Sequence, residues 1–337
     1  MTTYKGINGF AVQSVATDPS PSNEGQVWYN NASYAFKLAT LTTAGTWASG
    51  GNLTTSLYAI AGTGTQTAAL AFGGTSPTSV SNITQTYNGS SWTNVPATLG
   101  TARTATPATN GSQTAALAFG GAIDSAPYVV ANTETYNGTS WTPTGSLNTA
   151  RRSGGGAGTQ TAALSFGGFL YPPGDTAASE SFNGTSWTNT PSLNTARHGL
   201  GGCGTQTAAL AFSGGAPPNG GTLTTATELW NGTSWTSNPT GVNTARIGIA
   251  GCGIQTLALA FGGTAAGDTV AGATELWNGS TWTSNPNSLA TARRVMGGAG
   301  TQALGLGFGG LDPSVAVANT EEFTGPGSPV TKTITTS

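Results

Sequence analysis

The stretch Thr133–Trp141, TETYNGTSW, and the later stretch Gly158–Gly168, GTQTAALSFGG, decide the fold, because variants of both recur through most of the 337 residues. The first phrase ends in turn at Trp92, Trp141, Trp187, Trp235 and Trp282. The phenylalanine of the second phrase recurs every 46 to 49 residues, at Phe72, Phe119, Phe166, Phe212, Phe261 and Phe308. A period of this size corresponds to a whole supersecondary unit, so the sequence predicts one repeat domain.

The composition favours a folded protein with few charged partners. Charged residues make up 7% of the chain, against about 25% in an average soluble protein. Nine Trp and eleven Phe at regular positions are enough to build a core. The net charge is −2 and no basic stripe is present, which argues against nucleic acid and anionic membranes as partners. No apolar run approaches roughly 18 residues, so membrane insertion is not expected.

Each unit predicts four short strands. The phrase TQTAALAFGG is an apolar run that ends at a Gly pair, as a buried strand does, and a Gly-rich run such as Ser153–Gly158 supplies the strand before it. The phrase TETYNGTSWT predicts a hairpin with a two-residue Asn-Gly turn of type I′. Four short antiparallel strands repeated at this period indicate propeller blades.

The repeat also resembles the kelch repeat. A Gly-Gly doublet follows an apolar strand, and an aromatic residue then precedes a Trp by five residues, as in Tyr136 and Trp141. The resemblance covers about residues 41–325. The predicted fold class is all-β, a six-bladed kelch-like β-propeller with four antiparallel strands per blade.

The last unit lacks its Trp strand, and the chain carries a spare one near its start. Thr320–Thr324 reads as a third strand with no Trp after it, whereas Leu41–Ser49 contains Trp47. We expect this N-terminal strand to complete the last blade and close the ring, which removes an open sheet edge. The predicted divisions are residues 1–38, an attachment segment with a hairpin turning at Asn30–Ser33; residues 39–325, the propeller; and residues 326–337, a C-terminal tail.

Half of the ten basic residues occupy one repeat position, and five of the twelve acidic residues occupy another. The first unit has Leu57 and Gln85 at these two positions and lacks both charges, so we expect the positions to be in contact. The predicted structural pairs are Arg103 with Glu134, Arg151 with Glu180, Arg197 with Glu228, Arg246 with Glu275 and Arg293 with Glu321. The alternative is a ring of charge that binds a ligand, but a bidentate clamp within each blade is favoured.

The tryptophans have two interpretations. Exposed aromatic faces stack on sugars, but every Trp here holds the same strand position, where packing between blades requires a bulky side chain. Core packing is therefore the favoured role for the repeated Trp residues.

No constellation for catalysis or metal binding is apparent. His198 is the only histidine, and Cys203 and Cys252 replace alanine at equivalent repeat positions, where they read as small buried residues unless neighbouring strands bring them into a disulfide. Asp124, Asp175, Asp268 and Asp312 lie singly in different loops. We expect neither an enzyme, nor a metal site, nor a cofactor.

Variation between units is concentrated after the Gly-Gly doublet. These segments connect the second and third strands and are expected on the same face as the Arg-containing loops, whereas the opposite face carries only short turns. The ligand-binding candidates on the varied face are Tyr128, Phe169, Tyr171, Asp124, Asp175 and Asp268. The alternative is neutral variation of exposed loops.

The stretch DPSPSNEGQVWYNNASYAFK resembles the opening of structural and tail-fibre proteins of tailed bacteriophages, particularly marine ones, which also carry repeats of the NGTSW and TQTAALAFGG type. This implies a virion protein, assembled in the host cytoplasm without a signal peptide, whose partners are other virion proteins and a host-surface glycan. Trp28 and Tyr29 are the attachment candidates. A homo-oligomer is compatible with the resemblance. The alternatives are a capsid or tail decoration protein and a bacterial carbohydrate-binding or adhesion propeller.

Overall fold

The structure, a computed structural model, describes residues 12–19, 25–104, 106, 111–172, 174–217, 221–327 and 329–334. The chain forms two compact units: a terminal unit, residues 1–45 and 325–337, and a repeat domain, residues 46–324. Within the described ranges both consist of strands, and the one helical element is the short 3-10 turn η1 (Ala266–Asp268). The predicted all-β class is confirmed.

The terminal unit is a four-stranded sheet with the strand order β1-β2-β3-β33. Its strands are β1 (Gln13–Val15), β2 (Val27–Asn30), β3 (Ala35–Leu41) and β33 (Pro329–Thr333). The predicted hairpin is present, because β2 and β3 pair antiparallel from Val27 opposite Leu38 to Asn30 opposite Ala35. The Asn30 side chain accepts the backbone N–H groups of Ala32 and Ser33 and so shapes the turn.

The C-terminal residues belong to the same sheet, which differs from the separate tail expected for residues 326–337. Strand β3 is seven residues long, and β33 pairs with its residues Lys37–Leu41 along the edge opposite to β2. Lys37 lies opposite Thr333, and its Nζ donates to the Thr333 Oγ1 at 2.8 Å. The terminal unit therefore joins strands from near both ends of the chain and includes residues up to 45 rather than 38.

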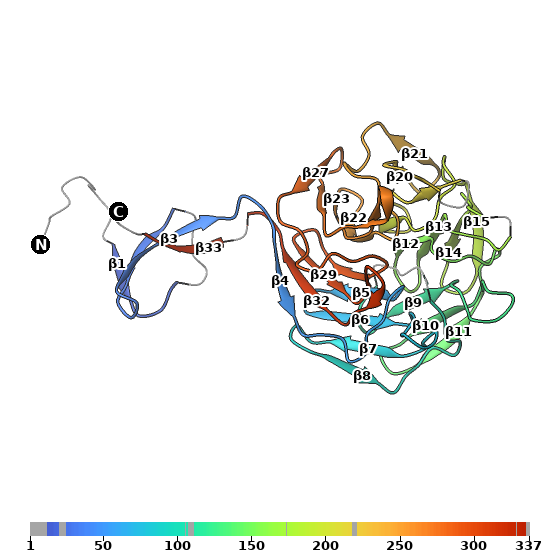
Figure 1. Ribbon diagram of the computed structural model, residues 1–337, viewed down its shortest axis with the longest axis horizontal. Coiled ribbons are helices and arrows are strands. Elements are labelled where there is room, and N and C mark those ends of the chain that lie inside the picture. Colours follow the sequence, from blue (N-terminus) through green and yellow to red (C-terminus); the bar gives the residue numbers. More distant parts are fainter. Residues whose placement is uncertain are drawn as a thin grey trace, which may run out of the picture. The chain divides into compact units, whose positions relative to one another are not determined.

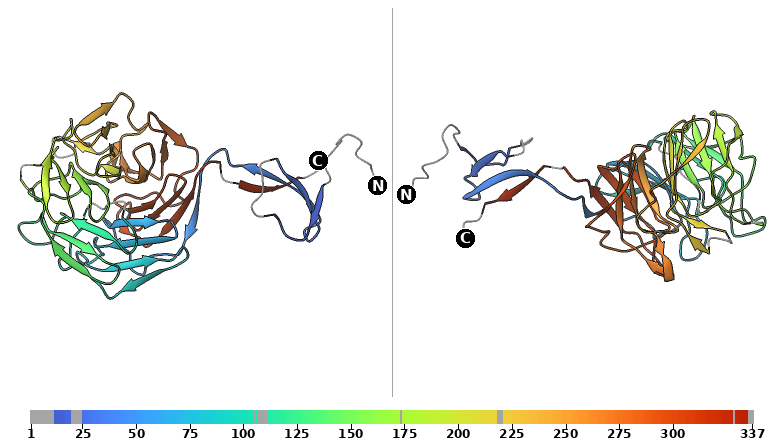
Figure 2. Two further views of the ribbon diagram at one scale, coloured as in Figure 1. Left: turned by 180° about the vertical axis from the view of Figure 1, so that it is seen from behind. Right: turned by 90° about the horizontal axis from the view of Figure 1, so that it is seen from above.

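Among its described residues the repeat domain contains six sheets of three or four strands, one for each sequence unit, arranged around a common centre (Figures 1 and 2). Sheet 1 contains β5 (Ala61–Thr65), β6 (Ala68–Phe72), β7 (Thr84–Tyr87) and β8 (Trp92–Val95). Sheet 2 contains β9 (Ala116–Phe119), β10 (Thr133–Tyr136) and β11 (Trp141–Thr144). Sheet 3 contains β12 (Gly155–Gly158), β13 (Ala163–Phe166), β14 (Ser179–Phe182) and β15 (Trp187–Thr190).

The remaining sheets follow the same pattern. Sheet 4 contains β16 (Gly201–Gly204), β17 (Ala209–Phe212), β20 (Thr227–Trp230) and β21 (Trp235–Asn238). Sheet 5 contains β22 (Ala250–Ile254), β23 (Leu257–Phe261), β26 (Thr274–Trp277) and β27 (Trp282–Asn285). Sheet 6 contains β28 (Gly297–Gly300), β29 (Leu304–Phe308), β32 (Thr320–Thr324) and β4 (Thr46–Gly50). Antiparallel four-stranded sheets in this arrangement are consistent with a β-propeller.

Strand β4 comes from the start of the repeat domain and pairs with β32 near its end. Trp47 lies opposite Phe323, as Trp141 lies opposite Tyr136 in sheet 2. The predicted pairing of the Trp47 strand with the last unit is therefore present. The strand covers Thr46–Gly50, whereas Leu41 belongs to β3.

The Asn-Gly hairpins are present, but the predicted type I′ turn is wrong. Four residues separate β10 from β11, and of these Gly138 alone has a positive φ, +94°. Type I′ requires positive φ at two consecutive residues. Instead, Asn137 Oδ1 accepts the backbone N–H groups of Thr139 and Ser140, both at 2.9 Å. Hydrogen bonds to the asparagine side chain thus shape a four-residue turn in place of the predicted two-residue turn.

Neighbouring sheets pack through tryptophan. In each sheet the Trp of the fourth-strand position (the last strand of the sheet) contacts the Phe of the preceding sheet, with ring centroids 4.8 to 5.1 Å apart, and its indole N–H donates to a Thr or Ser hydroxyl of that sheet. The pairs are Trp47–Phe261, Trp92–Phe308, Trp141–Phe72, Trp187–Phe119, Trp235–Phe166 and Trp282–Phe212. The repeated Trp residues are therefore packing residues and not an exposed platform for sugars.

The Gly-rich first strands leave room for these Phe rings. A Cβ on Gly155 would lie 2.2 Å from the Phe166 ring of its own sheet, and one on Gly202 would lie 2.7 Å from the same ring. Because Phe166 fills the space on both first strands, side chains are excluded there. The glycine run predicted as a strand is thus required by an aromatic ring as well as by neighbouring backbone.

Candidate ligand-binding face

The sheets have two ends. At one end lie the connections between second and third strands, and we call this end the loop face. At the opposite end lie the turns between first and second strands, and we call this end the turn face. The loop face rests on the five predicted Arg–Glu pairs. Their N–O distances are 2.6 to 3.0 Å, and the five Arg side chains are fully buried. The pairs are Arg103–Glu134, Arg151–Glu180, Arg197–Glu228, Arg246–Glu275 and Arg293–Glu321.

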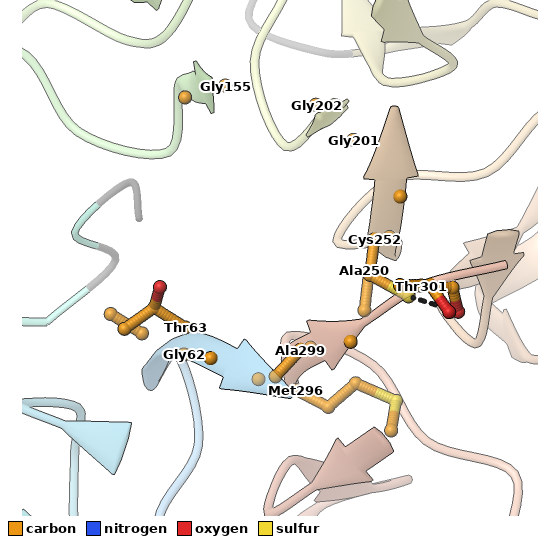
Figure 3. A pocket seen from close by; sticks show the side chains of 18 of the residues that line it. Gly62, Thr63, Gly155, Gly201, Gly202, Ala250, Cys252, Met296, Ala299 and Thr301 are labelled. Carbon is orange, nitrogen blue, oxygen red and sulfur yellow. Dashed lines mark hydrogen bonds between the residues drawn. The ribbon is translucent and has the colours of Figure 1, made fainter. Parts of the chain in front are cut away.

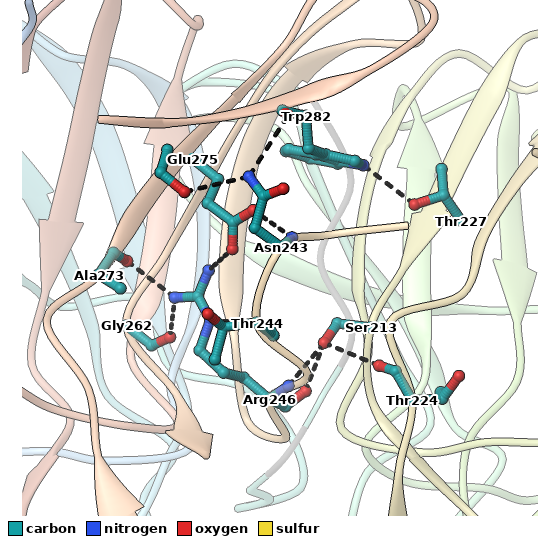
Figure 4. Close-up of polar contacts among 11 residues, drawn as sticks. Ser213, Thr224, Thr227, Asn243, Thr244, Arg246, Gly262, Ala273, Glu275 and Trp282 are labelled. Atoms are coloured by element: carbon teal, nitrogen blue, oxygen red, sulfur yellow. Dashed lines mark hydrogen bonds and ion pairs between the residues drawn. The ribbon is translucent and has the colours of Figure 1, made fainter. Parts of the chain in front are cut away.

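The pair in sheet 5 shows how such a clamp is built (Figure 4). Arg246 Nη2 lies 2.7 Å from Glu275 Oε1, while Arg246 Nη1 donates to the carbonyls of Gly262 and Ala273. Glu275 Oε2 accepts the backbone N–H of Asn243 at 2.6 Å. Burial lowers the pKa of Arg246, and the adjacent Glu275 carboxylate opposes that shift. These arginines hold the loops and do not face solvent, so they cannot form a ligand-binding ring of charge.

Sheet 1 keeps the position of the clamp without its charges. Leu57 and Gln85 are both fully buried, and Gln85 Oε1 accepts the backbone N–H of Thr54 at 2.9 Å. The amide thus replaces the carboxylate contact to the preceding loop. The joint absence of Arg and Glu from this unit has a local structural explanation.

Short β pairings hold the loops above the clamps. The residue after each Arg position, or after Leu57 in unit 1, bridges the third residue after the repeat Phe, as in Arg152 with Phe169. In three sheets the connection forms a two-stranded ribbon. The ribbons are β18 (Gly215–Ala216) with β19 (Thr222–Leu223), β24 (Thr264–Ala265) with β25 (Thr269–Val270), and β30 (Leu311–Asp312) with β31 (Val315–Ala316). The varied loops and the Arg-containing loops therefore share one face.

The loops of sheets 2 and 3 bring the three aromatic candidates together. Tyr128 and Tyr171 are 46% and 59% exposed, and their rings meet edge to face with centroids 5.4 Å apart. Phe169, on the same loop as Tyr171, contacts the His198 ring at 5.2 Å and lies under the Arg152 guanidinium at 5.3 Å. We call these five residues the aromatic cluster. Its tyrosines offer exposed ring surface, while Phe169 contacts both Arg152 and His198.

The three aspartate candidates have different surroundings. The Asp175 side chain is buried, and its Oδ1 contacts His198 Nδ1, which orients the histidine beside Phe169. Asp124 Oδ2 accepts the backbone N–H of Val80 on the neighbouring loop at 3.2 Å. Asp268 is exposed in η1, in the loop of sheet 5. The structure therefore places Asp175 beside the aromatic cluster, whereas Asp268 belongs to a different part of the face.

The two attachment candidates lie in the terminal unit and differ in exposure. Trp28 is fully buried, and its indole N–H donates to Asp18 at 2.9 Å. Tyr29 is half-buried, and its ring packs against Phe36 at 5.1 Å. Trp28 therefore supports the sheet rather than offering a free contact surface. The alternation of strand residues explains this, because adjacent side chains face opposite sides of the sheet.

Sequence reasoning missed two features, one on the loop face and one on the turn face. Arg152 and His198 take part in the aromatic cluster, and only the loop conformation brings them there. On the turn face, Ile254, Leu257 and Leu304 are each about half exposed. They occupy turn positions that carry Thr, Ser or Ala in units 1 to 4, a difference visible in the sequence.

The inner ends of the Arg-containing loops are tied to one another. Five residues share a left-handed φ and the same repeat position, two after the Arg or Leu57. Backbone hydrogen bonds of 2.6 to 2.8 Å link them: Gly199 N to Ser153 O, Gly248 N to Gly199 O, Val295 N to Gly248 O and Ala59 N to Val295 O. We call Ala59, Ser153, Gly199, Gly248 and Val295 the inner ring.

The cysteines are free and buried, so the alternative of a disulfide is not realised. Burial raises the pKa of Cys252 to about 12 and raises the pKa of Cys203 further.

Across the described ranges, no cluster of three or more His, Cys, Asp or Glu is placed to hold a metal ion. None of the helical structure in the described chain is long and apolar enough to span a bilayer.

The loop face thus combines the support of the Arg–Glu clamps with an exposed aromatic cluster and the contact between Asp175 and His198. Such a surface can bind a ligand by stacking and hydrogen bonding. Neither the protein-family models nor the curated proteins include one that matches this chain.

Proposed function

We propose that residues 46–324 form a closed six-bladed propeller of kelch-like repeats. Two series of contacts support this. The Gln of each strand 1–2 turn donates from Nε2 to two carbonyls of the preceding sheet at 2.5 to 3.3 Å. The series includes Gln66 of sheet 1, which reaches Gly305 and Phe323 of sheet 6. The Trp contacts follow the same order, since Trp92 of sheet 1 packs on Phe308 of sheet 6.

We propose that this propeller has a recognition function and is not an enzyme. The protein would be a bacteriophage virion component, a tail-fibre or receptor-binding subunit, that binds a host-surface glycan through its loop face. The observation that carries the proposal is the exposed edge-to-face pair of Tyr128 and Tyr171. Sugar rings present flat C–H faces that pack on aromatic rings, and the two exposed tyrosine rings offer such a surface.

The surroundings of the pair support a binding role. The clamp Arg151–Glu180 and the bridge between Arg152 and Phe169 fix the loop that carries Tyr171. A site held in this way loses little conformational entropy when a ligand binds. The Arg152 guanidinium and His198 next to Phe169 add hydrogen-bond donors that suit sugar hydroxyls.

The terminal unit fits an attachment role in this proposal. It joins β1 and β33, from near the two ends of the chain, in one sheet and has exposed apolar side chains, among them Tyr34 and Phe36. Other virion proteins would contact this unit, while the repeat domain carries the recognition face.

The test is a glycan-array and host-cell binding assay with the full chain and the variants Tyr128→Ala and Tyr171→Ala. Each substitution should weaken glycan binding at least about tenfold, because each removes half of the stacking surface. The matched control is Tyr34→Ala, which removes an 82% exposed tyrosine from the terminal unit and should leave binding unchanged. Equal binding by all four proteins, or none by the wild type, would overturn the proposal.

A further inference from the structure

A cavity of about 620 Å³ lies between the first strands of the sheets (Figure 3). Glycine backbone and small or aliphatic side chains line it, among them Ala250, Cys252, Met296 and Ala299. Among the described residues that line it, none is charged and none is aromatic. The volume falls within the roughly 300–1,000 Å³ of sites for small molecules. A buried charge without a partner is costly, so an occupant of this cavity must be uncharged.

The mouth on the turn face is unusually apolar. Ile254 and Leu257 line the cavity and are 50% and 49% exposed. The equivalent residues of unit 1, Thr65 and Ala68, are small or polar, as they are in unit 4. The turn itself does not require large aliphatic residues, because units 1 to 4 form it without them. A ligand that covers Ile254 and Leu257 would explain why this unit departs from the repeat.

At the wall of the cavity a buried hydroxyl lacks a partner. Thr63 lines the wall, is 2% exposed, and its Oγ1 makes no hydrogen bond in the described structure. Figure 3 shows Thr63 at the border of the open space, across from Ala250 and Cys252. An unsatisfied buried hydroxyl costs free energy that a ligand with a polar atom at this level would recover.

The opposite end of the cavity is narrowed by the inner ring. Its backbone hydrogen bonds join the loops of sheets 3, 4, 5, 6 and 1, and a small hollow of about 110 Å³ lies at this end among the described residues. We therefore assign the entry to the turn face, past Ile254 and Leu257.

We propose that the central cavity binds an uncharged, mainly aliphatic molecule with a hydroxyl or similar polar group. The aliphatic part packs between Ile254, Leu257 and Met296, and the polar group bonds to Thr63 Oγ1. This site is on the opposite face from the aromatic cluster and does not depend on glycan recognition.

The test uses the neutral apolar dye N-phenyl-1-naphthylamine with the full chain, and 1-decanol as the competitor. Wild-type protein should bind the dye with enhanced fluorescence, and 1-decanol should displace it. The double variant Ile254→Thr/Leu257→Ala gives this turn the residues of units 1 and 4, so it should fold, and it should bind the dye about tenfold more weakly. The matched control is Leu304→Ala, which removes an exposed leucine from the same face but outside the cavity lining and should change the affinity less than twofold.

Two further variants separate the parts of the proposal. Thr63→Val keeps the shape of the side chain, so dye binding should persist while 1-decanol competes several-fold less effectively. Tyr171→Ala should leave dye binding unchanged, so failure of glycan recognition and failure of this site are distinguishable. Absence of dye binding by the wild type, or equal affinity of the wild type and the double variant, would overturn the inference.

Discussion

Arg246 connects two sheets, because its guanidinium lies 2.7 Å from Glu275 of its own sheet while its backbone carbonyl accepts the N–H of Gly214 in the preceding sheet at 2.9 Å. The Ser213 hydroxyl donates to the same carbonyl at 2.7 Å. Glu275 also accepts the N–H of Asn243 in the connecting loop. The clamp therefore fixes the junction between sheets as well as the loop above it, and the repeat places equivalent clamps at four further junctions.

Removing the cation alone should be strongly destabilising. In Arg246→Ala the Glu275 carboxylate remains buried without its partner, and the loss should be about 3–5 kcal/mol in the free energy of unfolding. Urea denaturation followed by tryptophan fluorescence measures this difference. A change below about 1 kcal/mol would show that the pair is not the anchor of the junction.

The chain supplies its own control for this experiment. Unit 1 has Leu57 and Gln85 in place of Arg and Glu, and Gln85 keeps the hydrogen bond to the connecting loop. The double variant Arg246→Leu/Glu275→Gln should therefore be more stable than Arg246→Ala by about 2 kcal/mol, because no buried charge is left over. If both variants lose the same stability, the penalty comes from packing and not from the unpaired carboxylate.

The Arg–Glu contacts could be predicted because the repeats act as an internal alignment. Five joint occurrences and one joint absence at Leu57 and Gln85 carry the information. The turn type could not be predicted in this way. Asn-Gly favours type I′ locally, but here the Asn137 side chain binds the backbone of Thr139 and Ser140 and a longer turn results. Comparison of the units does not reveal the true turn type, because the five units that carry this hairpin share the same Asn-Gly sequence and give the same prediction.

Features outside the repeat were harder to predict. Strand β33 has no second copy for comparison, and its pairing with β3 depends on residues about 290 positions away in sequence, as the bond between Lys37 and Thr333 shows. Within the loop face, Tyr128, Phe169 and Tyr171 could be singled out as departures from the repeat. Their grouping with Arg152 and His198 depends on loop conformations that carry no periodic signal.

The inner ring predicts a stabilising substitution. Ser153 has φ +55°, and the equivalent residues of units 4 and 5 are Gly199 and Gly248. Ser153→Gly should raise the free energy of unfolding by about 1 kcal/mol, because a left-handed conformation costs a residue with a Cβ about 1–2 kcal/mol. Ser153→Ala keeps the Cβ and should bring no gain. Thermal unfolding of both variants distinguishes strain from the loss of the hydroxyl.

The Tyr87–Glu322 contact predicts a stability change at high pH. Tyr87 OH of sheet 1 donates to Glu322 Oε1 of sheet 6 at 2.5 Å. Burial, together with this hydrogen bond, raises the pKa of Tyr87 to about 12, whereas an unfolded tyrosine has a pKa of about 10. The contribution of Tyr87 to the free energy of unfolding is complete below pH 10. It is lost as the pH rises from about 10 to 12, because the tyrosine of the unfolded state then releases its proton first.

The variant Tyr87→Phe isolates this contribution. The difference in unfolding free energy between the wild type and Tyr87→Phe, measured in urea at several pH values, should shrink between pH 10 and 12. Other groups that titrate in this range are shared and cancel. A difference that stays constant across this range would contradict the assigned hydrogen bond.

The glutamine contacts test whether the six sheets close into a ring. Gln160 of sheet 3 donates to the Ala116 and Tyr136 carbonyls of sheet 2, and Gln66 of sheet 1 donates to the Gly305 and Phe323 carbonyls of sheet 6. Each Gln→Ala substitution leaves two carbonyls without their donor and should cost about 1–2 kcal/mol. In a closed propeller the two losses are equal. In an open arrangement Gln66 has no preceding sheet to hold, so Gln66→Ala would be neutral while Gln160→Ala would still be destabilising. Parallel urea denaturation of the two variants therefore decides between the closed and the open architecture.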